Sequence, residues 1–230
     1  MTHPFDNNQD SGSDQNFSSE AGFGNGSTEE LMLPPWERRE RFGFLNGLYL
    51  TIKDVLFAPR QFFHRMPTQI GLREPLYFAI VLGVIAAFFA WMWSLTGSSL
   101  QMLVSDNFDE VFAEPFKAFV FFLTSPITIV MLVFLKAGLL HGLLTVLGGN
   151  KLGFEATFRV AAYGEAAGIL ALVPACGSVI GLVWTIVVTV IGLYSIHDTE
   201  PWRAAVAVAI VATFCAGAAA MGVVSYMLTS

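Results

Sequence analysis

An uncharged run of twenty residues, from Leu76 to Leu95, constrains the fold of this chain more than any other feature. As an α-helix, this run would be roughly 30 Å long, which is the thickness of the hydrocarbon core of a bilayer. Charged residues make up only 13% of the whole chain, which is about half of their usual share in soluble domains. The sequence therefore predicts an integral membrane protein.

Four further hydrophobic stretches are long enough to cross a bilayer. The first of these lies in an apolar region from Phe116 to Gly149, which would be roughly 50 Å long as one helix. A helix break is therefore expected near Ser125–Pro126, with Phe116 to Thr124 at the membrane interface. The predicted fold class is all-α: an integral membrane bundle of five transmembrane helices, preceded by short amphipathic interfacial helices. The transmembrane domain is expected over residues 76–228, with spans at 76–95, 127–147, 154–173, 177–196 and 204–227.

Basic residues are concentrated on one side of these expected spans. Residues 35–75 hold seven of the twelve Lys and Arg residues, and Lys151 and Arg203 fall on the same side. The opposite side receives Lys117. Because basic loops stay in the cytoplasm, the amino terminus is expected inside and the carboxyl terminus outside.

The segment before residue 35 differs in composition from the rest of the chain. Residues 1–34 carry six acidic residues and no Lys or Arg, and they are too polar to form a packed core. They are therefore expected to be a disordered acidic cytoplasmic tail. An alternative is a docking tail in which Phe5, Phe17 and Phe23 bind a partner.

Residues 35–75 are expected to form cytoplasmic amphipathic helices. Proline at position 59 cannot continue a helix but suits the first turn of a new one, so two helices should meet at Ala58–Pro59. The second helix combines aromatic and basic side chains, as helices in the membrane interface do. These side chains could contact anionic lipid headgroups or a partner, or only pack against the spans. Nucleic acid is not an expected partner, because acidic residues are interleaved with the basic ones. The expected contact residues are Arg60, Phe62, Phe63 and Arg65.

Four ionisable residues fall inside the expected spans, where a charge is costly and so indicates a functional site. They are Lys136, His141, Arg159 and Glu165. Lys136 and Glu165 should both lie near the midplane of neighbouring antiparallel spans, which predicts an ion pair or hydrogen bond. His141 should lie one turn closer to the cytoplasm. Arg159 follows Glu155 by four residues, so these two could pair on one helix face.

This polar cluster has two interpretations. It could be a proton or ion relay or a polar pocket, or it could be a structural pair that fixes how the helices pack. The sequence carries no HExxH, GxSxG or GxxxxGK motif, and its Cys and His residues lack zinc-site spacing. We therefore expect no enzymatic activity, no catalytic residue, no metal site and no cofactor.

Four segments of the sequence form a recognisable set: DVLFAPRQFFHRMP before the first span, LREPLYFAIVLGVI entering it, FEATFRVAAYGEAAGILALVP in the third span and CGSVIGLVWTIVVTVIGLYSIHDT in the fourth. Together these segments resemble the Yip family of five-span membrane proteins, in its bacterial branch. The resemblance implies a five-span fold in the bacterial cytoplasmic (inner) membrane. Eukaryotic members of the family are implied to bind prenylated Rab-type GTPases.

Two functions are consistent with these observations. The first is a non-enzymatic membrane-organising scaffold or adaptor, whose inner-surface helices bind lipid or a partner. Its expected partners are the bilayer with its anionic headgroups, another copy of the chain in a homo-oligomer, or another membrane protein. The alternative is a small transporter or channel that uses the intramembrane polar residues.

Overall fold

The computed structural model describes residues 32–101, 108–173 and 176–229. Within these ranges the regular structure is helical, without strands, which confirms the all-α prediction. The tail predicted for residues 1–34 lies outside the described residues, except for its last three. The elements are the 3-10 helix η1 (Pro35–Arg38), α1 (Arg39–Phe42), α2 (Phe44–Phe57), α3 (Pro59–His64), α4 (Arg73–Gln101), α5 (Phe108–Val146), α6 (Gly153–Tyr163), the 3-10 helix η2 (Gly164–Leu172), α7 (Gly177–Ile196) and α8 (Pro201–Thr229).

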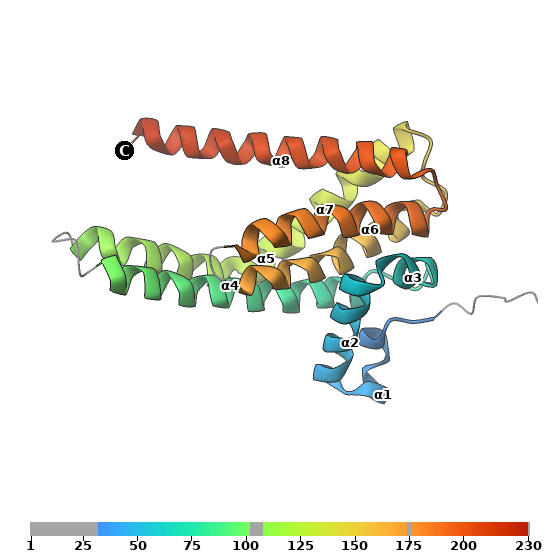
Figure 1. Cartoon of the computed structure of the whole chain (residues 1–230), viewed down its shortest axis with the longest axis horizontal. Helices are drawn as coiled ribbons and strands as arrows, with labels where there is room; N and C mark the ends of the chain where they lie inside the picture. Colours follow the sequence, from blue (N-terminus) through green and yellow to red (C-terminus); the bar gives the residue numbers. More distant parts are fainter. Residues whose placement is uncertain (1–31, 102–107, 174–175, 230) are drawn as a thin grey trace, which may run out of the picture.

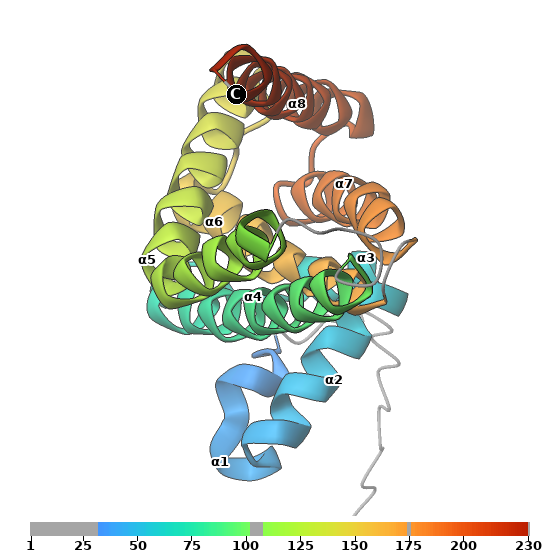
Figure 2. The ribbon, with the colours of Figure 1, turned by 90° about the vertical axis from the view of Figure 1, so that its left-hand side faces the viewer.

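The long helices run roughly along one direction, whereas α1 and α2 run across it (Figure 1). Helices α4 and α5 form a hairpin, α7 packs on η2, and α8 lies along α7 and the end of α5 (Figure 2). Among the described residues, three helices are long and apolar enough to cross a membrane: Arg73–Ser99, Pro115–Val146 and Gly177–Ile196. In α8, a shorter apolar stretch covers Pro201–Gly217.

The third predicted span is not one continuous α-helix. Helix α6 ends at Tyr163 and is followed directly by η2. Tighter winding at this point changes which side chains share a face, because a 3-10 helix has about three residues per turn. Length and composition of single α-helices therefore do not identify residues 154–173 as a span.

The predicted break in the second span is wrong, because α5 continues through Pro115 and Pro126. Pro126 has no N–H to donate to the carbonyl of Phe122, four residues earlier. The hydroxyl of Ser125 donates to this carbonyl instead, at 2.7 Å. Neighbouring Ser and Thr side chains can satisfy the backbone groups that proline frees within a membrane helix. The helix therefore remains intact.

Helices α2 and α3 meet at Ala58, as predicted. The α3 helix packs against the end of α7, where Gly192 allows the ring of Phe63 to approach. A Cβ atom at Gly192 would lie 3.0 Å from that ring. Trp36, from η1, makes edge contacts with Phe44 and Phe78. One hydrophobic core therefore joins the cytoplasmic helices predicted from the sequence to the long helices.

Candidate functional site

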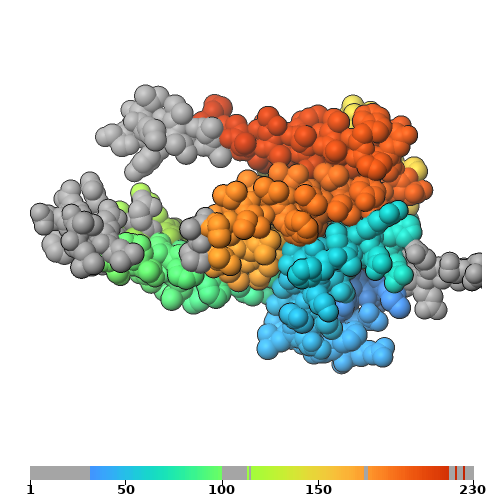
Figure 3. Space-filling view, in the orientation of Figure 1, coloured from blue at the N-terminus to red at the C-terminus, as the bar shows by residue number. Residues whose placement is uncertain are grey.

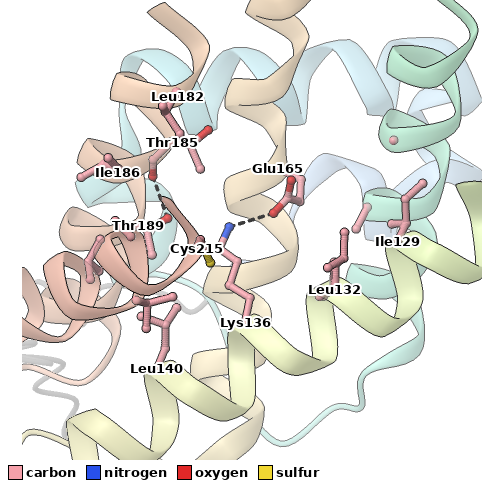
Figure 4. Close-up of a pocket in the computed structure, with 16 residues that line it drawn as sticks. Ile129, Leu132, Lys136, Leu140, Glu165, Leu182, Thr185, Ile186, Thr189 and Cys215 are labelled. Atoms are coloured by element: carbon pink, nitrogen blue, oxygen red, sulfur yellow. Dashed lines mark hydrogen bonds and ion pairs between the residues drawn. The ribbon is translucent and has the colours of Figure 1, made fainter. Parts of the chain in front are cut away.

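The predicted ion pair between Lys136 and Glu165 is present, with Nζ 2.7 Å from Oε1. Lys136 extends from α5, and Glu165 extends from the first turn of η2 (Figure 4). Their side chains remain 23% and 36% exposed, although both lie well inside the apolar part of the bundle. The reason for this exposure is the cavity that they line.

The intramembrane cavity has a volume of about 310 Å³ and is lined by α4, α5, η2, α7 and α8. Its walls are mainly aliphatic, and Lys136 and Glu165 are the charged residues among the described lining. The hydroxyl groups of Thr185 and Thr189 donate to carbonyls of their own helix, at 2.8 and 2.7 Å. The sulfur-bearing side chain of Cys215 also lines the cavity. This combination of an apolar wall and a few polar groups is typical of a small-molecule pocket.

His141 does not join this pair but belongs to a separate polar network at the end of α5. Its Nδ1 lies 3.4 Å from the hydroxyl of Thr157, and Nε2 lies 3.4 Å from the amide nitrogen of Asn150. The same hydroxyl lies 3.0 Å from Nε2 of the fully buried His197. The sequence interpretation did not include His197, and its only signal was a position directly after the fourth span.

His197 is held in the neutral form by its surroundings. Its Nδ1 accepts hydrogen bonds from the backbone N–H groups of Lys151 and Leu152, both at 3.3 Å. Burial, followed by the nearby His141, lowers the pKa of His197 to about 4. The imidazole therefore ties the α5–α6 loop to the end of α7.

The predicted pairing of Arg159 with Glu155 is wrong. Arg159 is fully buried and pairs with Glu37 of η1, while its Nη1 donates to the carbonyl of Gly71 at 3.0 Å. The Oε1 atom of Glu37, which pairs with Arg159, also accepts a hydrogen bond from the hydroxyl of Tyr163, at 2.5 Å. Burial raises the pKa of Glu37, and its bonds to Tyr163 and Arg159 oppose that rise.

Glu155 has a different role. Its Oε1 accepts hydrogen bonds from the backbone N–H groups of Ile70 and Gly71, at 2.7 and 2.8 Å. The carboxylate of Glu155, which helical spacing predicted to pair with Arg159, therefore binds the backbone of the loop before α4. The four predicted polar residues thus form three separate sites.

The predicted contact residues of α3 differ in exposure. Arg60 and Arg65 are exposed, but Phe63 is fully buried against α7 and Phe62 stacks edge-on against Tyr163 at 5.4 Å. Phe63 is therefore a core residue, which corrects its assignment as a lipid or partner contact. Among helices α1 to α3, the exposed large apolar side chains lie on α2 instead. They include Leu45 at 76%, Tyr49 at 63% and Phe57 at 82% exposure.

The described residues include no group of three or more His, Cys, Asp or Glu side chains that could hold a metal ion. The cysteines at 176 and 215 are free thiols.

One family model, described as the Yip1 domain, matches residues 53–223. Comparisons with curated proteins and with solved structures found no match. The matched range begins in α2 and continues into α8, so it includes the intramembrane cavity and more than half of the 230 residues. Its apolar helices make the protein a membrane protein of Yip type. The chain belongs to the Yip1 domain family.

Proposed function

We propose that this protein is a non-enzymatic membrane-organising scaffold with five spans and an amino terminus in the cytoplasm of a bacterial cell. Two elements extend the three long apolar helices to five spans. Helix α6 with eleven residues and η2 with nine together measure roughly 34 Å, at about 1.5 and 2.0 Å per residue. Helix α8, with 29 residues, measures roughly 43 Å. Both lengths are sufficient for the hydrocarbon core of a bilayer.

The exposed face of α2 is the observation that carries the scaffold proposal. Leu45, Tyr49 and Phe57 are exposed on a helix that runs across the long helices (Figure 1). The side chain of Lys53, on the same helix, is also exposed. Helical spacing places Lys53 between Tyr49 and Phe57 on this face. The helix can still lie in the membrane interface, because the long side chain of Lys53 can reach the headgroups while the apolar side chains are buried. Anchored in this way beside the spans, α1 to α3 would widen the inner half of the protein and impose its shape on the bilayer.

Vesicle shape tests this proposal. The full chain is reconstituted into vesicles containing anionic lipid, and vesicle diameters are measured by cryo-electron microscopy over a series of protein-to-lipid ratios. We expect the chain to narrow the vesicles, and we expect the triple variant Leu45→Ser, Tyr49→Ser, Phe57→Ser to lose this effect. The double variant Lys136→Met, Glu165→Leu is the matched control and should keep it. Equal effects of wild type and triple variant would refute the scaffold proposal.

A small transporter or channel is the second candidate, because the intramembrane cavity reaches the pair Lys136 and Glu165. Cys215 lines this cavity and can report on its contents in a Cys176→Ser background. A transport pathway predicts that a charged, water-soluble thiol reagent modifies Cys215, and that changing the ion pair alters solute flux into vesicles. A cavity without a water pathway predicts modification only by an apolar reagent that dissolves in the bilayer.

A further inference from the structure

A second cavity, of about 250 Å³, lies between residues 32–38 and helices α2 and α3. The backbone N–H of Met32 donates to the carbonyl of Arg65 at 2.9 Å, which closes one side of this α2–α3 cavity. In Figure 3, the blue segment after residue 31 lies against the cyan atoms of α3. Two of the residues that line the cavity, Met32 and Leu33, have exposed apolar side chains.

Charged side chains line the α2–α3 cavity without pairing with one another. Arg38 and Arg65 bring two guanidinium groups, and Asp54 brings one carboxylate. Among the described residues, no hydrogen bond or ion pair engages these three side chains. Arg38 instead lies over the ring of Phe42, and its Nε is buried without a hydrogen-bond partner. Burial raises the pKa of Asp54, and the positive charge of the neighbouring Lys53 opposes that rise.

This arrangement specifies the chemistry of a ligand. Guanidinium groups bind phosphate through charge-assisted hydrogen bonds, often two at a time. A carboxylate in the same cavity would repel a ligand that carried phosphate alone, but it would attract an ammonium group. The amide of Gln61 adds a further polar contact. A ligand with one phosphate and one primary ammonium group would therefore satisfy all three charged side chains.

We propose that the α2–α3 cavity binds the headgroup of a phosphoethanolamine-type phospholipid, with Arg38 and Arg65 on the phosphate and Asp54 on the ammonium group. The proposal rests on the proposed function, in which α2 and α3 lie in the inner membrane interface. The cavity could hold about eight water molecules at roughly 30 Å³ each, which is comparable to the few non-hydrogen atoms of such a headgroup. A lipid is the source to which we commit, because the exposed apolar side chains of Met32 and Leu33 line the cavity and can meet the acyl chains.

Native mass spectrometry of the full chain in detergent tests the assignment. Short-chain phosphatidylethanolamine, phosphatidylglycerol with the same acyl chains, and soluble phosphoethanolamine are titrated separately. Wild type should bind phosphatidylethanolamine about tenfold more tightly than either alternative. Arg38→Gln and Arg65→Gln should each weaken binding of both lipids about tenfold or more, the loss expected when a charge-assisted hydrogen bond is removed. Asp54→Asn should abolish the preference for phosphatidylethanolamine without weakening phosphatidylglycerol.

Arg60→Gln is the matched control, because Arg60 is exposed on the same helix but does not line the cavity. Arg38→Lys and Arg65→Lys, which keep the charge, should retain most of the binding and exclude a folding defect. A loss with Arg60→Gln equal to that with Arg65→Gln would overturn the proposal, and so would an unchanged lipid preference in Asp54→Asn. Equal binding of soluble phosphoethanolamine would overturn the lipid as the source.

The headgroup assay and the vesicle assay can fail separately. Binding in detergent does not depend on the exposed face of α2, so the Leu45, Tyr49 and Phe57 triple variant should still bind the headgroup. If that variant binds normally but wild type does not narrow vesicles, the scaffold proposal fails and the headgroup site stands. If wild type narrows vesicles without a lipid preference, the headgroup site fails and the scaffold proposal stands.

Discussion

Replacing Arg159 by Met should destabilise the protein more than any other loss of a single ion pair in its described part. Arg159 has no exposed surface, and the side chain of its partner Glu37 is 5% exposed. After the substitution, Glu37 would keep only the hydrogen bond from Tyr163 in the same buried position. Removing one member of a buried pair typically costs about 3–5 kcal/mol, because the other charge is left uncompensated. We therefore expect the free energy of unfolding to fall by that amount at neutral pH.

The loss should become smaller in acid. Burial raises the pKa of Glu37 in the native protein, and removing Arg159 takes away an opposing positive charge. The carboxyl can therefore take up a proton more readily, which removes the uncompensated charge. As the pH falls toward this raised pKa, the penalty of Arg159→Met should decrease.

Reversible unfolding in mixed detergent, followed by circular dichroism, measures these free energies. A double-mutant cycle with Glu37→Gln isolates the coupling between the two side chains. Lys151→Met is the control, because Lys151 and Asp198 are 54% and 94% exposed and such a pair contributes about 0–1 kcal/mol. If Arg159→Met lost no more stability than Lys151→Met, or the cycle gave no coupling, the assigned role of the buried pair would be refuted.

Three further predictions concern the packing and titration of the bundle. Burial lowers the pKa of His197 from 6.5 to about 4. The neutral imidazole therefore contributes its full stability above pH 6.5, and the free energy of unfolding should fall by up to about 3 kcal/mol as the pH falls toward 4. The free energy of unfolding of His197→Gln, measured as a function of pH, should lack this decrease. Gly192→Ala places a Cβ 2.6 Å from the nearest side-chain atom and should destabilise by about 1–3 kcal/mol. Gly138→Ala, where that space is open, should change the unfolding free energy by less than about 1 kcal/mol in the same assay. Lys136→Met alone should destabilise more than the double variant with Glu165→Leu, because the single change leaves a charge in the cavity; equal losses would contradict a coupled pair.

Hydropathy was sufficient to locate the long helices, because a bilayer requires an unbroken apolar surface of known length. Helix α7 has the predicted bounds, Gly177–Ile196. Helix α4 extends beyond the apolar run at both ends. Its extension contains Ser98 and Ser99, whose hydroxyl groups donate to carbonyls of the same helix at 2.9 Å. Polar residues that bond to their own helix lower the hydropathy without ending the helix.

The two errors in helix continuity have one physical cause. A proline predicts a break because it removes a donor, but the hydroxyl of Ser125 supplies another donor to the same carbonyl. Conversely, the apolar residues around Gly164 predict a continuous helix, yet the chain changes there from α to 3-10 winding. In both places continuity depends on hydrogen bonds and packing that hydropathy does not record.

The sequence could predict the partners of some polar residues but not of others. Lys136 and Glu165 could be paired from sequence, because depth in two adjacent antiparallel helices follows from residue counts alone. Arg159 could not, because its partner Glu37 precedes the first span by many residues and is brought to it by the tertiary fold. Helical spacing proposed the neighbouring Glu155, whose carboxylate is used by the loop before α4.

The assignment of lipid-facing residues shows why periodicity alone was insufficient. An amphipathic helix attached to membrane spans has two apolar surroundings, the bilayer and the other helices, and hydrophobic periodicity does not distinguish them. Phe63 faces the protein because Gly192 leaves space for its ring on α7. That contact fixes α3 against the bundle, and α2, which directly precedes α3 in the chain, exposes Leu45 and Phe57. A glycine more than a hundred residues away in the chain thus selects which aromatic side chains can meet lipid, so a larger residue at position 192 should change membrane contact as well as stability.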